Sequence, residues 1–369
     1  MSNVIRLNAP VRGQGGADPR AAMIDAFAHH RRGPEDVFWL KENAELLNIL
    51  ECTGARLDPA ALAPHHDFYE RIEAYLTFFP QYYRFVLSIC LDLEDLGLAG
   101  AKSEALARYA VREGLAEAEL SDLQRLEARR LMRRRGLDPL AWDTGLEARV
   151  RRFLGRPATF AVPNRKVGYE LTHLVFYLSD YGRRDPELSR KALTSLEYAG
   201  ILAYLDLDAD ILAEICIAMR YSGVVPPGIW ERWLARETRG FRVETGATGA
   251  LPDDYHAFLV CNWGIAAAGG DAFAQSVPPG RMTFRRPLRP PSPLREISEC
   301  LYRMQDARSA DWEVMRPRIE GVICERSAAV LNEARASCES FAGFFASFAR
   351  AAVTVGPRAD AVLGTSCDG

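Results

Sequence analysis

The sequence predicts an all-α protein made of helix-pair repeats of about 40 residues, arranged as an α/α toroid or an irregular helical solenoid. Three observations support this fold class. Glycines recur at similar intervals where helix-like runs end, and apolar residues hold fixed positions before these glycines. Strand patterns are weak throughout, and the clearest of them covers residues 241–245.

The glycines mark the expected helix ends. Glycine tolerates the left-handed conformation that commonly follows the last turn of a helix, and a proline soon afterwards favours the start of a new helix. The intervals between these glycines are 43, 39, 46, 41 and 46 residues. The glycines are Gly54, Gly97, Gly136, Gly182, Gly223 and the pair Gly269-Gly270. Because one helix pair cannot bury its own apolar face, repeats of this length are expected to stack.

Apolar residues stand eight and four positions before each of the first five glycines. They are Leu46, Ile89, Ala128, Leu174 and Ile215, then Leu50, Leu93, Met132, Leu178 and Met219. A shared i, i+4 stripe predicts that one face of each glycine-terminated helix packs in the core. Second helices, expected at 67–79, 187–204 and 227–236, would complete the pairs.

The rest of the chain is divided as follows. Residues 1–33 are predicted to form a flexible N-terminal segment, and residues 34–275 form the helical-repeat domain. Residues 276–295 are rich in Pro and Arg and are expected to be a connector. Residues 296–353 should form C-terminal helices packed on the repeat domain, and residues 354–369 should form a mobile tail.

The composition excludes several classes of protein. A hydrophobic content of 48% supplies a sizeable core, and a net charge of −3 provides no general attraction to nucleic acid or acidic membranes. No signal peptide and no apolar run of about 18 residues is present, so a cytoplasmic location without membrane contact is expected. The eight cysteines form no CxxC pair, which argues against a zinc knuckle or a disulfide scaffold. The Arg- and Ala-rich usage is typical of bacteria with GC-rich genomes.

A polar column lies beside the apolar stripe. Nine residues before the first five glycines stand Glu45, Ser88, Glu127, His173 and Glu214. In a toroid, the inner helices turn one face towards a central cavity, where a His/Glu set can bind a metal or transfer protons. The alternative is that the column is the solvated side of amphipathic helices, and this alternative is favoured for Glu127, which lies among arginines.

Two histidines are the preferred candidates within this pattern. The helix that carries His173 is apolar on nearly all sides, so this histidine should be buried and need a partner, and Asp180 follows two turns later. His256 falls 42 residues after Glu214, which falls 41 after His173. We predict that His173, Asp180, Glu214 and His256 are catalytic. His173, Glu214 and His256 would bind a divalent metal, and a hydrogen-bonded core network is the alternative.

Other candidate residues have simpler interpretations. Cys261 could supply a thiolate close to the site, but a core cysteine is the simpler explanation. Neighbours on a helix point about 100° apart, so the doublets His29-His30 and His65-His66 are predicted to lie on the surface. Acidic clusters at 92–95 and 206–210 are poor diphosphate-binding motifs, and the second is expected to cap the helix that follows it.

Two stretches are strongly basic. Residues 122–166 contain eleven Arg and one Lys against five acids, and residues 281–295 contain five Arg and no acid. They could bind phosphate, nucleic acid or an acidic protein, although a solvated helix face is the simpler explanation. Nucleic acid is disfavoured as a partner because the net charge is negative and no reader motif occurs.

Residues 165–265 are similar to a family of uncharacterised bacterial helical proteins with the segment LTH-x2-FY-x2-D-x-G, which runs here from Leu171 to Gly182. The segments 210–214 and 255–256 match further polar positions of that pattern, but the resemblance implies no activity. The repeat also resembles the α/α toroids of lanthionine synthetase C-like and terpene cyclase proteins. The zinc-binding Cys…Cys-His set of the first group is missing, and the aspartate-rich motif of the second is not present in good form. Neither chemistry transfers.

These observations support two functions. The first is an enzyme or a binder of a small molecule or peptide, with a polar His/Glu site in a central helical cavity and a divalent metal as the cofactor. The alternative is a helical-repeat scaffold that binds a protein partner through its arginine-rich faces. The choice depends on whether the polar column faces a cavity.

Overall fold

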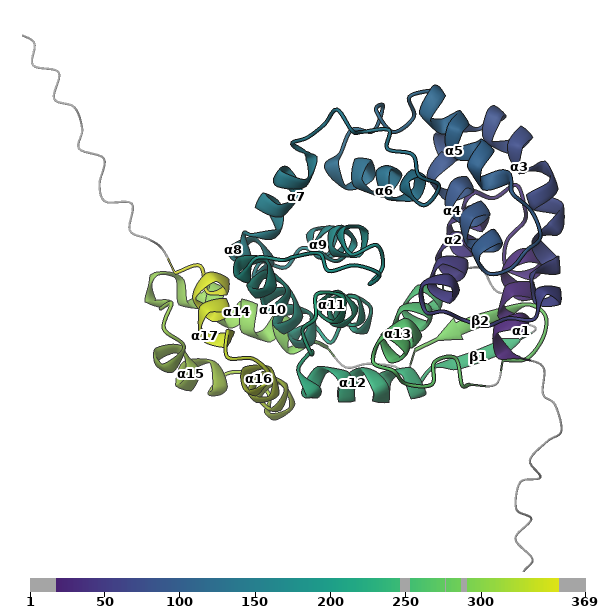
Figure 1. Cartoon of the computed structure of the whole chain (residues 1–369). Coiled ribbons are helices and arrows are strands. Elements are labelled where there is room, and N and C mark those ends of the chain that lie inside the picture. The colour runs from purple at the N-terminus through teal and green to yellow at the C-terminus, as the bar shows by residue number, and fades with distance from the viewer. Residues whose placement is uncertain (1–17, 246–252, 276, 287–290, 352–369) are drawn as a thin grey trace, which may run out of the picture.

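The computed structural model describes residues 18–245, 253–275, 277–286 and 291–351. Within these ranges the chain forms seventeen α-helices and one two-stranded sheet, so the prediction of a mostly helical protein is confirmed (Figure 1). In the same ranges no helix is long and apolar enough to cross a membrane.

Six helices end two to four residues before the glycines that the sequence singles out. They are α2 (Val37–Cys52), α4 (Tyr83–Asp95), α6 (Asp122–Arg133), α9 (Arg165–Leu178), α11 (Ala209–Tyr221) and α13 (Tyr255–Ala267). At α9 the left-handed residue that ends the helix is Asp180, with a φ of 47° and with Tyr181 N–H bonded back to Phe176 O at 2.8 Å, so the stop predicted at Gly182 is wrong. At the other five helices the glycine itself follows the helix end and has a φ between 68° and 109°, which confirms the predicted left-handed stop. The next amide then bonds back to the helix, as in Ala55 N–H to Leu50 O at 2.9 Å and Val224 N–H to Met219 O at 2.9 Å.

Each of these six helices, called the inner helices below, contacts the next one along the chain. Helix α2 contacts α4, and the contacts continue through α6, α9, α11 and α13, which in turn contacts α2. All ten residues of the predicted apolar stripe are at most 4% exposed. The second helices lie outside the first set in Figure 1. They are α3 (His66–Phe78), α5 (Lys102–Arg112), α7 (Leu146–Leu154), α10 (Arg190–Leu205) and α12 (Gly228–Arg239).

The N-terminal segment differs from the flexible stretch predicted for residues 1–33. From Pro19 onward it is helical, as α1 (Pro19–Asp25) and the π-helix η1 (Ala26–His30), and residues 1–17 lie outside the described ranges. Met23, Ile24 and Phe27 are at most 1% exposed. Their apolar side chains add to the core, so this part of the chain is held by packing.

A buried arginine joins the first and last inner helices. Arg31 Nε lies 2.8 Å from Glu42 Oε2 at the start of α2, and its Nη1 lies 2.8 Å from Asp253 Oδ2, just before α13. Nη1 also donates to Met282 O at 2.8 Å. Three aromatic rings lie 4.9–5.3 Å from its Cζ: Phe27, Tyr255 and Phe284. The guanidinium therefore crosslinks segments more than 200 residues apart in the sequence.

The weak strand pattern at 241–245 is confirmed as β1 (Arg242–Thr245). It pairs antiparallel with β2 (Met282–Arg285), with Arg242 opposite Arg285 and Thr245 opposite Met282. Strand β2 lies within the predicted connector at 276–295, of which residues 276 and 287–290 lie outside the described ranges. The connector is therefore partly folded onto the N-terminal side of α13, where Phe284 O accepts from Asp254 N–H at 3.0 Å.

The C-terminal helices pack on one side of the repeat, as Figure 1 shows. They are α14 (Pro293–Met304), α15 (Trp312–Glu320), α16 (Glu325–Ser337) and α17 (Phe341–Phe348). Their contacts reach α8 (Pro157–Phe160), α10 and α12. The short helices η2 (Pro59–His65), η3 (Pro80–Tyr82) and η4 (Gln305–Ala307) complete the fold, and the predicted tail at 354–369 lies outside the described ranges.

The surface position predicted for His65 is wrong, whereas His66 is exposed as predicted. The His65 side chain is 0% exposed, and its Nε2 lies 2.8 Å from Asn43 Oδ1. The two rings differ because His65 ends η2 and turns inward towards Trp39, with ring centroids 6.0 Å apart, while His66 begins α3 on the outer side. Burial lowers the pKa of His65 from 6.5 to about 3.

This buried imidazole predicts a dependence of stability on pH. Below pH 6.5 His65 binds a proton in the unfolded chain, whereas in the folded protein it binds one only below about pH 3. Acid therefore favours the unfolded state between these two pH values. The free energy of unfolding should be about 2 kcal/mol lower at pH 5 than at pH 7 from this group. Urea unfolding followed by circular dichroism at both pH values would measure the difference. The His65→Gln variant should lose this share of the pH slope and His66→Gln should keep it, whereas equal slopes in all three proteins would contradict the prediction.

Candidate metal centre

Three residues from two adjacent inner helices form a group that could hold a metal ion. Asp210 and Glu214 stand one turn apart on α11, and His256 lies in the first turn of α13. One ligand atom from each residue lies within 4.8 Å of the other two. The Asp208 side chain accepts from Asp210 N–H at 3.2 Å and so caps α11, which confirms the expected capping role of this acidic cluster. The helix that begins there presents Asp210 and Glu214 on one face.

Hydrogen bonds hold each member of the group in place. His256 Nδ1 lies 2.9 Å from Asp210 Oδ1, and the hydroxyl of Tyr169 donates to Asp210 Oδ2 at 2.7 Å. The hydroxyl of Thr172 donates to Glu214 Oε2. Such outer contacts orient metal ligands in known sites.

A third carboxylate reaches the group from α2. Glu45 Oε1 lies 3.8 Å from His256 Nε2, and Glu45 Oε2 accepts from the hydroxyl of Tyr255 at 2.8 Å. Glu45 belongs to the polar column of the sequence, and this contact connects the first inner helix with the last. Three acidic side chains therefore surround one imidazole.

The pKa values follow from this crowding. Burial alone would lower the pKa of His256, but the hydrogen bond to Asp210 and the charges of Glu45 and Glu214 raise it to about 10. Burial also opposes ionisation of Asp210, yet its bond to His256 keeps the pKa of Asp210 below the ordinary value. Burial raises the pKa of Glu214, whose side chain is 2% exposed. A metal ligand must be a neutral imidazole, so a cation bound at His256 would displace its proton and take the place of its charge beside the carboxylates.

His173 lies beside this group. Its Nδ1 is 2.8 Å from Tyr169 O and 3.7 Å from Glu214 Oε2, and its side chain is 34% exposed. Because a carbonyl oxygen can only accept, Nδ1 is the donor in the contact with Tyr169 O. Asp210 stands in the three-residue group where the sequence pattern suggested His173.

Asp180 belongs to a different set of contacts, contrary to the expectation from helical spacing. Arg130 Nε donates to its Oδ1 at 2.7 Å. Helix α9 ends at Leu178, and Asp180 has a φ of 47°, so the period of the helix no longer governs its direction.

The remaining candidates have local partners. Glu127 forms an ion pair with Arg84, and Ser88 donates to Asp92 Oδ2 at 3.1 Å. Cys261 is buried, and its Sγ lies 3.8 Å from Ala209 O. This position fits the core cysteine that was the simpler explanation.

Asp210 and His256 do not belong to the polar column, but a second regular position in the sequence indicates them. Tyr169, Asp210 and His256 stand thirteen residues before Gly182, Gly223 and Gly269, one helical turn ahead of the column at position nine. Residues four apart share a helix face, so both columns meet in the same region.

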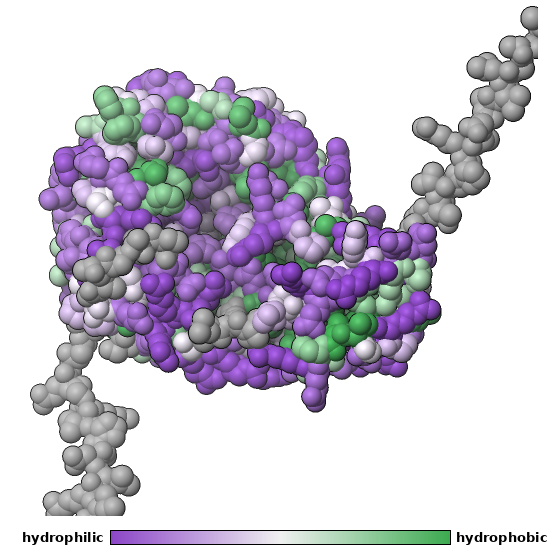
Figure 2. All heavy atoms as spheres, turned by 180° about the vertical axis from the view of Figure 1, so that it is seen from behind, coloured by the Kyte–Doolittle hydropathy of each residue, from purple (hydrophilic) through white to green (hydrophobic). Residues whose placement is uncertain are grey.

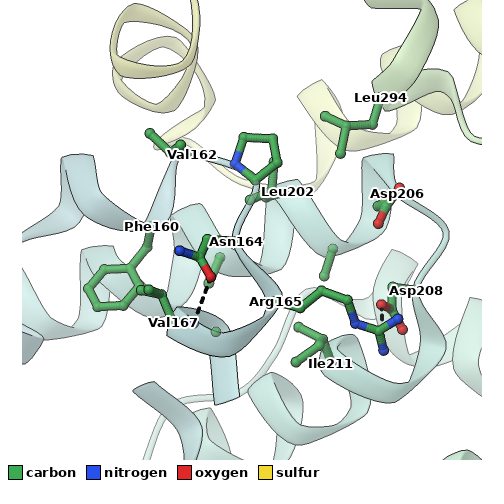
Figure 3. Close-up of a pocket in the computed structure, with 14 residues that line it drawn as sticks. Phe160, Val162, Asn164, Arg165, Val167, Leu202, Asp206, Asp208, Ile211 and Leu294 are labelled. Carbon is green, nitrogen blue, oxygen red and sulfur yellow. Dashed lines mark hydrogen bonds and ion pairs between the residues drawn. The ribbon is translucent and has the colours of Figure 1, made fainter. Parts of the chain in front are cut away.

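A pocket of about 180 Å³ adjoins the N-terminal ends of α9 and α11 (Figure 3). Its walls are mainly apolar and include Phe160, Val167 and Leu294. Arg165 lines it and forms an ion pair with Asp208 at 3.1 Å, drawn as a dashed line in Figure 3. The same guanidinium lies 3.6 Å from Asp210 Oδ2, so Arg165 contacts both the pocket and the group that could hold a metal ion.

Four neighbouring arginines of the basic stretch at 122–166 pair with acids of the same chain. Arg129 and Arg133 both pair with Asp138. The next two arginines pair with acids of α4: Arg134 with Asp92 and Asp95, and Arg135 with Glu94 and Asp95. Figure 2 shows a mainly hydrophilic face with separate hydrophobic patches. Internal pairing leaves these side chains less able to bind an acidic partner.

A family model described as a domain of unknown function, DUF6902, matches residues 1–351. The match covers most of the chain, so the protein belongs to this family, and the expected likeness to uncharacterised proteins extends well beyond residues 165–265. No curated protein and no solved structure matches the chain.

Proposed function

We propose that this member of the DUF6902 family is a metal-dependent hydrolytic enzyme that acts on a small molecule at Asp210, Glu214 and His256. The observation that carries the proposal is the convergence of these three side chains within 4.8 Å. Metal ligands at about 2.1 Å from an ion lie roughly 3–4 Å apart, so a contraction of about 1 Å would complete the site.

The donor set fits a divalent transition metal. Two carboxylates and one imidazole suit Zn²⁺, Mn²⁺ or Fe²⁺, and no thiolate belongs to the group. Three protein ligands leave coordination positions for water or substrate, as catalytic sites require. A bound cation with open positions polarises water or a substrate oxygen.

The surrounding residues have separate roles in this proposal. His173 accepts a proton at Nε2, while its Nδ1 stays fixed on Tyr169 O at 2.8 Å. Tyr169 orients Asp210, and Thr172 orients Glu214. The pocket of about 180 Å³ beside Arg165 would receive the apolar part of the substrate.

We further infer that the six inner helices form the inner ring of an α/α toroid. The contact between α13 and α2, added to those between successive inner helices, supports a closed arrangement. In such a ring the polar columns face the axis, and this accounts for polar side chains on helices that are otherwise buried. The scaffold alternative has less support because the arginines from Arg129 to Arg135 are paired internally.

Metal binding tests the proposal. Purified protein, dialysed against Zn²⁺ or Mn²⁺, should retain about one ion per chain by elemental analysis. The His256→Ala and Glu214→Gln variants should lower the affinity about 100-fold, because each lacks a ligand. Isothermal titration calorimetry would measure the change, and circular dichroism would verify folding.

Two histidine variants serve as controls. His66→Ala removes an exposed imidazole and should leave metal binding unchanged. His173→Ala should also retain the metal, since His173 transfers protons in this proposal. Absence of metal binding by the wild type, or equal affinity in the wild type, His256→Ala and Glu214→Gln, would refute the metal centre.

A further inference from the structure

A second pocket, of about 120 Å³, lies between α6 and the turn that follows α9. Five arginines line it, together with Leu126, Tyr177 and Asp180. The arginines are Arg129, Arg130, Arg133, Arg134 and Arg184. Asp180 is the acidic residue of this lining, so the wall carries a clear excess of positive charge.

One of these arginines has unused hydrogen-bonding capacity in a buried position. Arg130 is 6% exposed, and its Nη2 has no hydrogen-bond partner among the described residues. A buried donor without a partner is costly, and the cost is recovered when a ligand accepts from it. Its Nε already donates to Asp180 Oδ1 at 2.7 Å, which fixes the plane of the guanidinium.

The backbone beside the pocket adopts the left-handed conformation, which is unusual for residues other than glycine. Asp180 and Tyr181 have φ values of 47° and 52°, followed by Gly182 at 84°. This turn places the ring of Tyr181 4.4 Å from Arg130 Cζ. Arg184 Nε donates to Leu178 O at 2.6 Å, and its terminal nitrogens have no partner among the described residues. Strained backbone of this kind often accompanies a binding site.

We infer that this pocket binds a phosphate group, either as inorganic phosphate or as part of a phosphomonoester. Guanidinium groups on two sides, from α6 and from the turn after α9, suit a tetrahedral anion, whereas a planar carboxylate needs a single fork. Arg130 Nη2 and the terminal nitrogens of Arg184 are the donors. Asp180 is a positioning residue that holds Arg130 and limits the affinity for the anion.

Titration calorimetry of the full chain at low salt, after treatment with a chelator, tests this inference. Inorganic phosphate and phenyl phosphate should bind, and the tighter of the two shows whether the natural ligand is free or esterified. Arg184→Gln should weaken binding about tenfold. Asp180→Asn should strengthen it, because Asn tolerates the left-handed conformation and removes a negative charge.

Three controls distinguish phosphate binding in this pocket from binding of anions elsewhere on the protein. Arg108→Gln, at a side chain that is 65% exposed and pairs with Glu104, should bind phosphate normally. His256→Ala should also bind normally, because its site is separate. Acetate should bind far more weakly than phosphate. The inference is overturned if phosphate does not bind, if Arg184→Gln binds as the wild type does, if Asp180→Asn weakens binding, if His256→Ala abolishes it, or if acetate binds equally well.

Discussion

Replacement of Arg31 by Met is expected to lower the free energy of unfolding by about 3–5 kcal/mol. Arg31, Glu42 and Asp253 have side chains that are at most 1% exposed, so the substitution removes a cation from beside two buried carboxylates. Arg32 still reaches Glu42 Oε1 at 2.8 Å, which leaves Asp253 as the more isolated charge. The contacts that connect the N-terminal helices with α13 and β2 would be lost as well.

Chemical denaturation of the wild type and of Arg31→Met measures this effect. Asp253→Asn should recover part of the loss when it is added to Arg31→Met, since it removes the unpaired charge. Arg112→Met is a suitable control because the Arg112 side chain is 70% exposed and pairs with the adjacent Glu113. A loss below about 1 kcal/mol in Arg31→Met would contradict the prediction, because it would mean that the buried pairs contribute little.

The Gly182→Val substitution should cost about 2–5 kcal/mol. Gly182 has a φ of 84°, which a β-branched residue rarely adopts, and a Cβ there would lie 2.5 Å from Tyr221 Cδ1. Backbone strain and the collision with the Tyr221 ring therefore add. The Tyr221 ring cannot move aside easily, because its hydroxyl accepts a hydrogen bond from Trp263 Nε1 at 2.9 Å.

Gly136→Val separates the two causes. Gly136 also follows an inner helix and has a φ of 74°, but a Cβ there would meet nothing within 4 Å. This variant should lose about 1–2 kcal/mol from backbone strain alone. Thermal and urea unfolding of both variants would give the difference, and equal losses would show that the Tyr221 contact has no energetic consequence.

The site could be predicted only in part. Glu214 could be predicted because it occupies a regular position before a stop glycine, and His256 because it falls 42 residues after Glu214. Asp210 was not predicted as a member of the site, because acids at the start of a helix usually act as caps, and Asp208 does so here. Asp180 was misplaced because helical spacing was extended past Leu178, where the backbone leaves the helix.

Several ion-pair partners of the arginine-rich stretch are residues distant in the sequence. Arg134 reaches Asp92 and Asp95 on α4, whose positions relative to α6 follow from helix packing and not from local sequence. His65 is a similar case, because its neighbour His66 has the same chemistry and the opposite exposure. Local composition cannot distinguish a solvated charge from a paired one.

The sequence by itself determined the helical class, five of the six left-handed stops predicted from Gly54 to Gly269, and the apolar stripe before them. These features depend on backbone conformation and on the period of one helix, which are local properties. Tertiary structure alone decided that α13 contacts α2, that Glu45 meets His256, and that Asp210 lies together with Glu214 and His256. Those outcomes require the relative positions of helices up to about 200 residues apart, and packing of whole faces sets such positions.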